Sequence, residues 1–297
     1  MFSGLSAFPL TPISGEGIDE AAFVSLVRRL TTAGVDSICA LGSTGSYAYL
    51  TVAERAQVAR IAVEHAGDVP VIVGIGAMRA RDVLALAEDA QKAGASGVLL
   101  APVSYQKLTD DEVFGLYEAV TRQLSVPLCV YDNPGTTHFE FSDALHGRIA
   151  QLPNVRSIKI PGVPADPVAA KARVDRLRGR IPSHVTIGIS GDACAATGLN
   201  AGCEAWYSVI GGLFPQVAVA ITRAAQAGNA EEAVRLSDCL KPLWALFGKH
   251  GGSLRVVAAA AELLGLVLSP SLPLPLVAVG GVERQQLAAL LDELGLV

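Results

Sequence analysis

Residues 71–101 read VIVGIGAMRARDVLALAEDAQKAGASGVLLA and contain one complete repeat of a pattern that runs through most of the chain. A short continuous apolar run, Val71–Ile75, is followed by Ala80–Ala93, where apolar residues recur at helical spacing up to Gly94. The next apolar run, Val98–Ala101, begins the following unit. Short apolar runs that alternate with helices predict parallel strands buried on both faces.

This unit recurs along the chain, and the repeats together predict the fold. The strands are expected at Leu5–Leu10, Val35–Leu41, Val71–Ile75, Val98–Ala101, Leu128–Tyr131, Val155–Ile160, Val185–Ile189 and Ala205–Val209. The helices are expected at Asp19–Ala33, Thr51–Ala66, Ala80–Ala93, Thr109–Leu124, Ser142–Gln151, Pro167–Leu177, Ala193–Leu199 and Pro215–Ala227. Eight such units predict an α/β fold of the (β/α)8 TIM barrel type. A doubly wound sheet is the alternative, but the nearest phosphate-binding fingerprint, Gly74–Arg79, lacks its third glycine.

The strand pattern stops after Gly228, and the rest of the chain has helical spacing. Three helices are expected there, at Ala230–Phe247, Ser253–Leu264 and Glu283–Leu296. We therefore predict two domains: residues 1–227, a (β/α)8 barrel that carries the active site, and residues 228–297, a C-terminal three-helix extension.

Composition excludes several classes of function. With 51% hydrophobic and 17% charged residues in 297, wholesale disorder is excluded, and a net charge of −5 offers no basic surface for nucleic acid. The five cysteines are odd in number and form no CxxC, which argues for a reducing, cytoplasmic setting and against a structural metal. The most apolar stretch, Val256–Val279, is interrupted by a glutamate and three prolines, and no signal peptide pattern opens the chain. We expect no metal, no other cofactor and no membrane partner.

Lys159 lies in the run VRSIKIP at residues 155–161, whose apolar positions alternate as in a strand. Burial disfavours an ammonium ion and lowers its pKa, which produces a nucleophilic amine at neutral pH. Such an amine can attack a carbonyl to form a Schiff base. The ordinary alternative is a strand-end lysine that pairs with a carboxylate or reaches solvent.

In a barrel of this kind, chemistry takes place at the C-terminal ends of the strands. Polar residues follow five of the predicted strands, at Gly42–Ser46, Tyr131–Thr137, Lys159, Ser190–Asp192 and Tyr207–Ser208. Each has an ordinary explanation as a turn, a helix cap or a core aromatic residue. Together they predict an amine, a phenol and hydroxyl groups around one barrel mouth, which is the set that imine chemistry on a 2-oxo acid requires.

These segments, in this order, resemble the dihydrodipicolinate synthase / N-acetylneuraminate lyase family of class I Schiff-base aldolases and lyases. The chain is similar in its Gly42-Ser43-Thr44-Gly45 turn, in Tyr131-Asp132-Asn133-Pro134 and in Ser157-Ile158-Lys159. The segment Gly202–Ser208 also matches, with Ala205 in place of the family's second glycine. The resemblance covers nearly the whole chain.

The resemblance implies a role for each matching residue. Lys159 would form the imine with pyruvate or a pyruvyl substrate, and Tyr131 would shuttle protons above it. Ser43 and Thr44 would bind the substrate carboxylate, and Thr44 would also hydrogen-bond Tyr131. Tyr207 would lie close to the bound 2-oxo acid. Relatives in this family are commonly tetramers built from dimers, so a homotetramer or homodimer is implied.

Four departures from the family pattern bear on the choice of substrate and on the proton relay. Ser46 replaces a glutamate, Asp132 replaces an asparagine, and Thr136 stands where the synthases carry an arginine that grips the aldehyde's carboxylate. A threonine cannot form a bidentate charged pair. The family's second relay tyrosine, lent by a neighbouring subunit, corresponds to Ser104, with Tyr105 one residue away.

The leading hypothesis is a lyase or aldolase that joins or cleaves a pyruvate-type 2-oxo acid and an aldehyde through a Schiff base. One alternative is 4-hydroxy-tetrahydrodipicolinate (dihydrodipicolinate) synthase of lysine biosynthesis, with altered contacts to its acceptor. An alternative of another class is a non-catalytic pyruvate-binding barrel. Neither the acceptor aldehyde nor the physiological direction follows from these residues.

Overall fold

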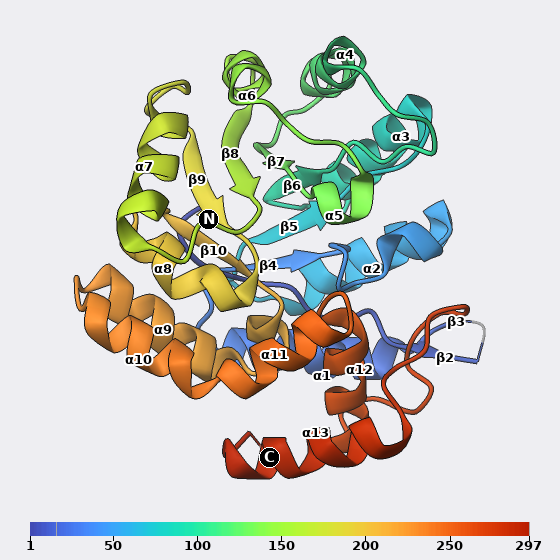
Figure 1. Ribbon diagram of the computed structural model, residues 1–297. Coiled ribbons are helices and arrows are strands. Elements are labelled where there is room, and N and C mark those ends of the chain that lie inside the picture. Colours follow the sequence, from blue (N-terminus) through green and yellow to red (C-terminus); the bar gives the residue numbers. More distant parts are fainter. Residues whose placement is uncertain (16, 297) are drawn as a thin grey trace.

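The computed structural model describes residues 1–15 and 17–296, and a closed barrel of eight parallel strands forms its centre (Figure 1). The strands are β1 Gly4–Ala7, β4 Ser37–Ala40, β5 Val71–Gly74, β6 Gly97–Leu100, β7 Leu128–Tyr131, β8 Val155–Ile160, β9 Thr186–Ile189 and β10 Ala205–Ser208. The barrel closes because β1 pairs with both β10 and β4. The predicted (β/α)8 fold is confirmed, and the doubly wound alternative is excluded.

A helix follows each strand and covers the outside of the barrel (Figure 1). These helices are α1 Glu20–Ala33, α2 Val52–His65, α3 Ala80–Lys92, α4 Asp110–Thr121, α6 Asp143–Ile149, α7 Pro167–Arg178, α8 Ala195–Asn200 and α9 Pro215–Gln226. The predicted capping box of α2 is present: Thr51 accepts from the Glu54 N–H, and the Glu54 side chain accepts from the Thr51 N–H.

Several short elements at the strand ends were not expected from the sequence. They are the hairpin β2 Ile13–Ser14 and β3 Gly17–Ile18, the 3₁₀ helices η1 Tyr47–Tyr49, η2 Asp192–Cys194 and η3 Ile210–Gly212, and the single turn α5 Pro134–Thr137. Each follows the C-terminal end of a barrel strand. They therefore shape the mouth at which the expected site residues lie.

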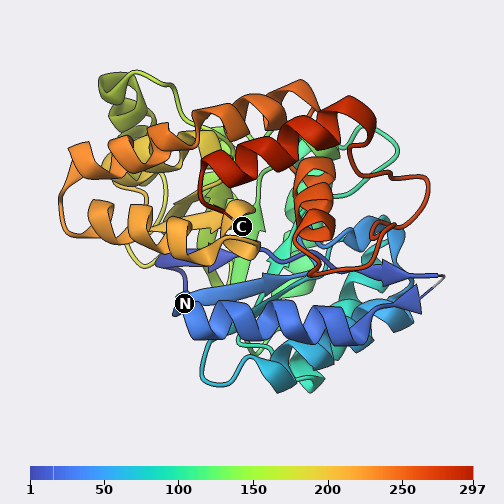
Figure 2. The same ribbon diagram turned by 90° about the horizontal axis from the view of Figure 1, so that it is seen from below.

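The C-terminal part differs from the prediction in its helix count. It contains α10 Ala230–Cys239, α11 Lys241–Lys249, α12 Leu254–Leu263 and α13 Gly281–Glu293, so the single helix expected at Ala230–Phe247 is wrong. Pro242 lies in the first turn of α11. A proline in a continuous helix would lack its N–H and clash with the carbonyl four residues earlier, so the chain breaks at Leu240. Figure 2 shows the last four helices gathered along one side of the barrel, where α10 packs against α8 and α9.

Two apolar layers surround the strands, and the inner one supports the site. Side chains that point outward join the helices in one large core. Side chains that point inward form a second cluster, made of Phe2, Phe8, Cys39, Ile72, Leu99, Ala101, Cys129, Tyr131, Ala205 and Tyr207. Alternation along each strand produces the two layers. Among the described residues, no helix is long and apolar enough to cross a membrane.

Candidate active site at the barrel mouth

Lys159 lies near the end of β8 with its side chain inside the barrel, and the residue is only 3% exposed. Its Nζ lies 3.9 Å from the ring centroids of both Phe8 and Tyr131, and 5.6 Å from that of Tyr207. No carboxylate in residues 1–15 and 17–296 forms an ion pair with it. Both ordinary explanations, a carboxylate partner and a solvent-exposed end, therefore fail in this structure.

Tyr131 is the residue opposite Lys159 in the register of β7 and β8. Its hydroxyl accepts a hydrogen bond from Asn133 Nδ2 at 2.8 Å and lies 3.3 Å from Ser43 Oγ. We expected Thr44 to make this contact. No hydrogen bond joins Thr44 to Tyr131 in the described part of the chain, so the hydroxyl that reaches the phenol belongs to Ser43.

The turn after β4 brings backbone donors to the same mouth. The Gly45 N–H donates to the Gly42 carbonyl at 3.0 Å, and the Ser46 N–H donates to that of Ser43 at 3.1 Å. The N–H groups of Ser43 and Thr44 donate to no other atom of residues 1–15 and 17–296. Two adjacent free N–H groups beside a hydroxyl are well suited to hold a carboxylate.

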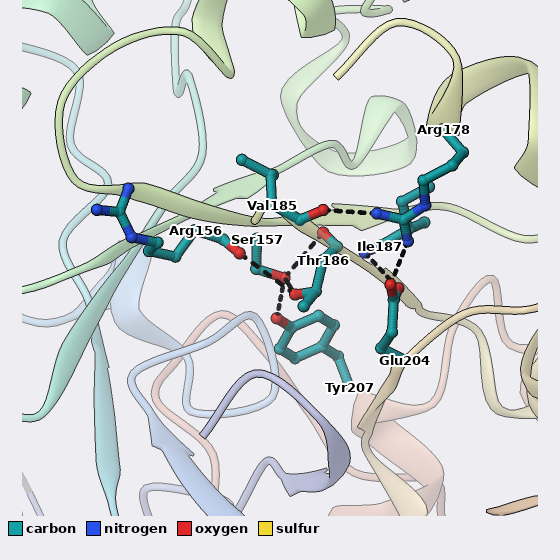
Figure 3. A network of polar contacts seen from close by, with 8 residues as sticks. All are labelled: Arg156, Ser157, Arg178, Val185, Thr186, Ile187, Glu204 and Tyr207. Atoms are coloured by element: carbon teal, nitrogen blue, oxygen red, sulfur yellow. Dashed lines mark hydrogen bonds and ion pairs between the residues drawn. The ribbon is translucent and has the colours of Figure 1, made fainter. Parts of the chain in front are cut away.

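Tyr207, on β10, is 1% exposed, and its hydroxyl points toward Ser157 on β8 (Figure 3). The hydroxyl lies 2.7 Å from Ser157 Oγ and accepts from Cys129 Sγ at 3.3 Å. Burial raises the pKa of Tyr207 well above its ordinary value. Its ring centroid lies 5.6 Å from the Lys159 Nζ, and its hydroxyl is engaged with the side chains of Ser157 and Cys129.

The absence of a side chain at Gly188 leaves room for the Tyr207 ring. A Cβ at this position would lie 2.2 Å from Cε2 of Tyr207. Thr186, two residues earlier on β9, donates to Ser157 Oγ at 2.9 Å (Figure 3). The floor beneath the lysine is therefore a hydrogen-bonded, closely packed layer contributed by neighbouring strands.

The departures noted in the sequence have clear positions in the structure. Thr136 is exposed on α5, and its hydroxyl donates only to the Asn133 carbonyl, at 3.4 Å. Ser46 is 2% exposed in a left-handed conformation, and its Oγ has no partner among the described residues. Ser104 Oγ donates to the Gln106 carbonyl at 2.5 Å, and Tyr105 is 90% exposed. Neither Ser104 nor Tyr105 reaches Tyr131 of the same chain.

Asp132, which stands where the family has an asparagine, lies beside a buried histidine. Its carboxyl is buried on the outer side of the barrel, with Oδ2 3.5 Å from Nε2 of His146 on α6. Burial raises the pKa of Asp132 to about 7, although Arg173 lowers it in part. Burial also lowers the pKa of His146 to about 4. Both groups are therefore neutral over most of the range between these values.

Three residues at the site were missed as functional by reasoning from the sequence. Phe8 borders Lys159, Asn133 holds the Tyr131 hydroxyl, and Ser157 supports Tyr207. Asn133 could have been found, because it directly precedes the proline of the motif. Nothing in the local sequence distinguishes Phe8 or Ser157 from ordinary core residues. No group of three or more metal-ligating side chains is found within residues 1–15 and 17–296.

A (β/α)8 barrel with a buried lysine and an adjacent tyrosine at the C-terminal strand ends defines a lyase of the class I aldolase type. A match to the dihydrodipicolinate synthetase family covers residues 1–294, and the chain belongs to this family.

Known relatives cover the whole chain. It is 31% identical over 300 residues to a 4-hydroxy-tetrahydrodipicolinate synthase from Parvibaculum lavamentivorans, with all of both chains covered. It is 45% identical to the crystal structure of a dihydrodipicolinate synthase from Agrobacterium tumefaciens, with a TM-score of 0.94 over 99% of this chain and 98% of the other. The dihydrodipicolinate synthase from Acinetobacter baumannii, solved with pyruvate, is 26% identical with a TM-score of 0.89 over all of both chains.

Proposed function

We propose that this protein joins or cleaves pyruvate, or a closely related 2-oxo acid, and an aldehyde through an imine on Lys159. The observation that carries the proposal is the Lys159 amine, buried between the Phe8 and Tyr131 rings with no ion-pair partner in the described residues. A lysine amine in this position can attack a carbonyl carbon and form a Schiff base. The Acinetobacter baumannii relative, whose structure holds pyruvate, supports this choice of substrate.

In this mechanism the free N–H groups of Ser43 and Thr44 hold the carboxylate of the 2-oxo acid. The Lys159 amine then attacks the neighbouring carbonyl carbon and forms a carbinolamine. Tyr131 donates a proton to the departing hydroxyl, which leaves as water, while the nitrogen lone pair completes the C=N bond. Ser43 and Asn133 orient the phenol for this transfer. The Tyr207 ring closes the pocket on the β10 side.

The test is covalent trapping with pyruvate and borohydride, read by intact mass. One reduced pyruvyl adduct per chain is expected, and Lys159→Ala should abolish it. Lys171→Ala is the matched control, because Lys171 is exposed and paired with Asp175 at 2.6 Å. An adduct on another lysine, or none, would disprove the assignment of Lys159.

A second candidate is 4-hydroxy-tetrahydrodipicolinate synthase, supported by the name of the Parvibaculum relative at 31% identity. The exposed Thr136, in the position of the family's arginine, argues against it. A panel of aldehydes offered together with pyruvate separates the two candidates. Efficient condensation with aspartate semialdehyde alone would favour the synthase.

The proposal also covers the oligomeric state of the chain and the cellular compartment in which it works. A homotetramer or homodimer is supported by Tyr105 and Met78, large side chains that are 90% and 70% exposed on the loops at the mouth. Five free cysteines support a reducing, cytoplasmic setting. Residues 1–227 would carry the chemistry, and residues 228–297 would form a helical unit against the barrel. Light scattering at several concentrations tests the assembly.

A further inference from the structure

A buried carboxyl and imidazole pair lies directly behind the proposed catalytic tyrosine. Asp132 follows Tyr131 at the end of β7, and the alternation of side chains turns its carboxyl away from the mouth toward α6. There Oδ2 lies 3.5 Å from Nε2 of His146, whose side chain is fully buried. The ring of Phe141 stacks on the imidazole at 4.8 Å, with an interplanar angle of 4°.

The pair has few other polar partners. Oδ1 of Asp132 and both ring nitrogens of His146 make no hydrogen bond with any atom of residues 1–15 and 17–296. A charged pair at this site would leave an ionised oxygen without donors in an apolar setting. Attraction across 3.5 Å with imperfect geometry compensates poorly for the loss of hydration of two ions.

The charges around the pair act in opposite directions on an ionised Asp132, and burial outweighs the one cation, Arg173, that favours it. Arg173 on α7 faces both groups, but it pairs with Asp143 at 3.0 Å, and Arg176 binds the same carboxylate at 3.0 Å. The other ionisable groups that face the pair are Glu140, before α6, and Tyr117 on α4, whose hydroxyl donates to the Leu100 carbonyl at 2.6 Å. Glu140 and Asp143 both repel a carboxylate at position 132.

We propose that Asp132 is a positioning residue that works as a neutral carboxylic acid packed against the neutral imidazole of His146, and that this uncharged pair fixes the end of β7. In this state the single proton of the pair stays on the Asp132 carboxyl, and no charge is buried. Asp132 occupies the position of the asparagine that is usual in the family. The proposal deepens the function above and, in its kinetic arm, rests on it.

The backbone connects this pair to both catalytic groups. The Asp132 N–H donates to the Lys159 carbonyl at 3.0 Å, and the next residue, Asn133, donates its amide to the Tyr131 hydroxyl. Ionisation of Asp132 would place a negative charge among buried groups and the nearby Glu140 and Asp143. The carboxylate would then draw in water or move away from His146. Either change would shift the end of β7 and displace Asn133 and the Tyr131 hydroxyl. Turnover should therefore fall as pH rises above the point at which the pair loses its proton.

The first experiment measures kcat for the pyruvate reaction against pH in the wild type, Asp132→Asn and Asp175→Asn. The wild type should lose activity about tenfold per pH unit once the pair ionises. Asp132→Asn keeps the hydrogen-bonding shape without the ionisation, so it should stay within about threefold at neutral pH and lose this alkaline decline. Asp175→Asn, an exposed control on α7, should follow the wild type. An unchanged alkaline decline in Asp132→Asn would overturn the proposal.

The second experiment does not depend on activity. Infrared spectroscopy of protein labelled with 13C-aspartate should show, at pH 6, the carbonyl stretch of a protonated carboxyl that is missing from equally labelled Asp132→Asn, and this band should disappear as the pH is raised. The comparison is needed because burial also raises the pKa of Asp192. The absence of such a band at pH 6 would overturn the proposal even if trapping on Lys159 succeeds. If trapping fails while the band is present, the function is wrong and the neutral pair stands.

Discussion

The free energy of unfolding should respond to pH in opposite directions when Asp132 and His146 are replaced one at a time. Burial raises the pKa of Asp132 from its ordinary 3.8 to about 7, and it lowers that of His146 from 6.5 to about 4. Between pH 4 and 6.5 the folded pair holds one proton, on the aspartic acid. The unfolded chain also holds one, on the histidine. Since the proton counts match, the pair adds no pH dependence to the wild-type stability in this window.

Each replacement removes one of the two titrating groups, so the proton counts of the folded and unfolded states no longer match. In His146→Phe, Asp132 alone remains, and its folded-state pKa is raised. Its stabilising contribution is fully present below pH 3.8 and is lost as pH rises to about 7. At ~1.36 kcal/mol per pH unit, a window of about three units corresponds to a loss of ~4 kcal/mol. In Asp132→Asn, His146 alone remains with a lowered pKa, so stability is present above pH 6.5 and falls by ~3 kcal/mol as pH drops to about 4.

Urea unfolding of the three proteins at half-unit steps from pH 4 to 7.5 measures these slopes. The other carboxylates titrate alike in all three proteins. The differences between their slopes of unfolding free energy against pH therefore report only on Asp132 and His146. We expect His146→Phe to lose stability with rising pH relative to the wild type, and Asp132→Asn to gain it. Parallel curves for the three proteins would refute the assignment of the proton to a buried neutral pair.

Three further outcomes are expected. Tyr131→Phe should retain the fold and the reducible adduct but lower turnover by about 10²- to 10⁴-fold in steady-state assays, and near-normal turnover would exclude the phenol from proton transfer. Thr136→Arg should improve kcat/KM with aspartate semialdehyde by up to roughly 10- to 150-fold, the equivalent of about 1.5–3 kcal/mol for a charged contact to its carboxylate, and no improvement would show that another residue binds that group. Gly188→Ala should destabilise the barrel by about 1–3 kcal/mol in urea, because its Cβ would meet the Tyr207 ring at 2.2 Å. Gly115→Ala, on an exposed face of α4 with no atom within 4 Å, is the matched control, and equal effects at both positions would disprove the clash.

Local patterns were sufficient to predict the fold and the two central residues of the site. The eight strand–helix repeats identified the barrel, because continuous apolar runs between helices are stable only as buried parallel strands. The order of the Lys159, Tyr131 and Gly42–Ser46 segments placed them at one mouth, since the C-terminal ends of parallel strands all meet there. The apolar spacing across Ala230–Phe247 predicts one helix, whereas Pro242 breaks it between α10 and α11.

Other features depend on contacts between residues far apart in the chain. The Ser43–Tyr131 contact, the Phe8 ring beside Lys159 and the Ser157–Tyr207 floor each join different strands of the closed barrel. Whether Ser43 or Thr44 reached the phenol depended on the left-handed turn at Leu41 and Ser46, which a motif does not specify.

Asp132 most clearly separates what the sequence determines from what only the tertiary structure determines. Its position after Tyr131 marks it as a departure from the family pattern, and an exposed aspartate there would be charged at neutral pH. The sequence therefore determined that a carboxyl stands next to Tyr131. Only the tertiary structure decided its protonation state, because burial against His146 and Phe141 sets the free energy of the ionised form. Residue type is a local property of the chain, whereas solvation depends on everything that folds around it.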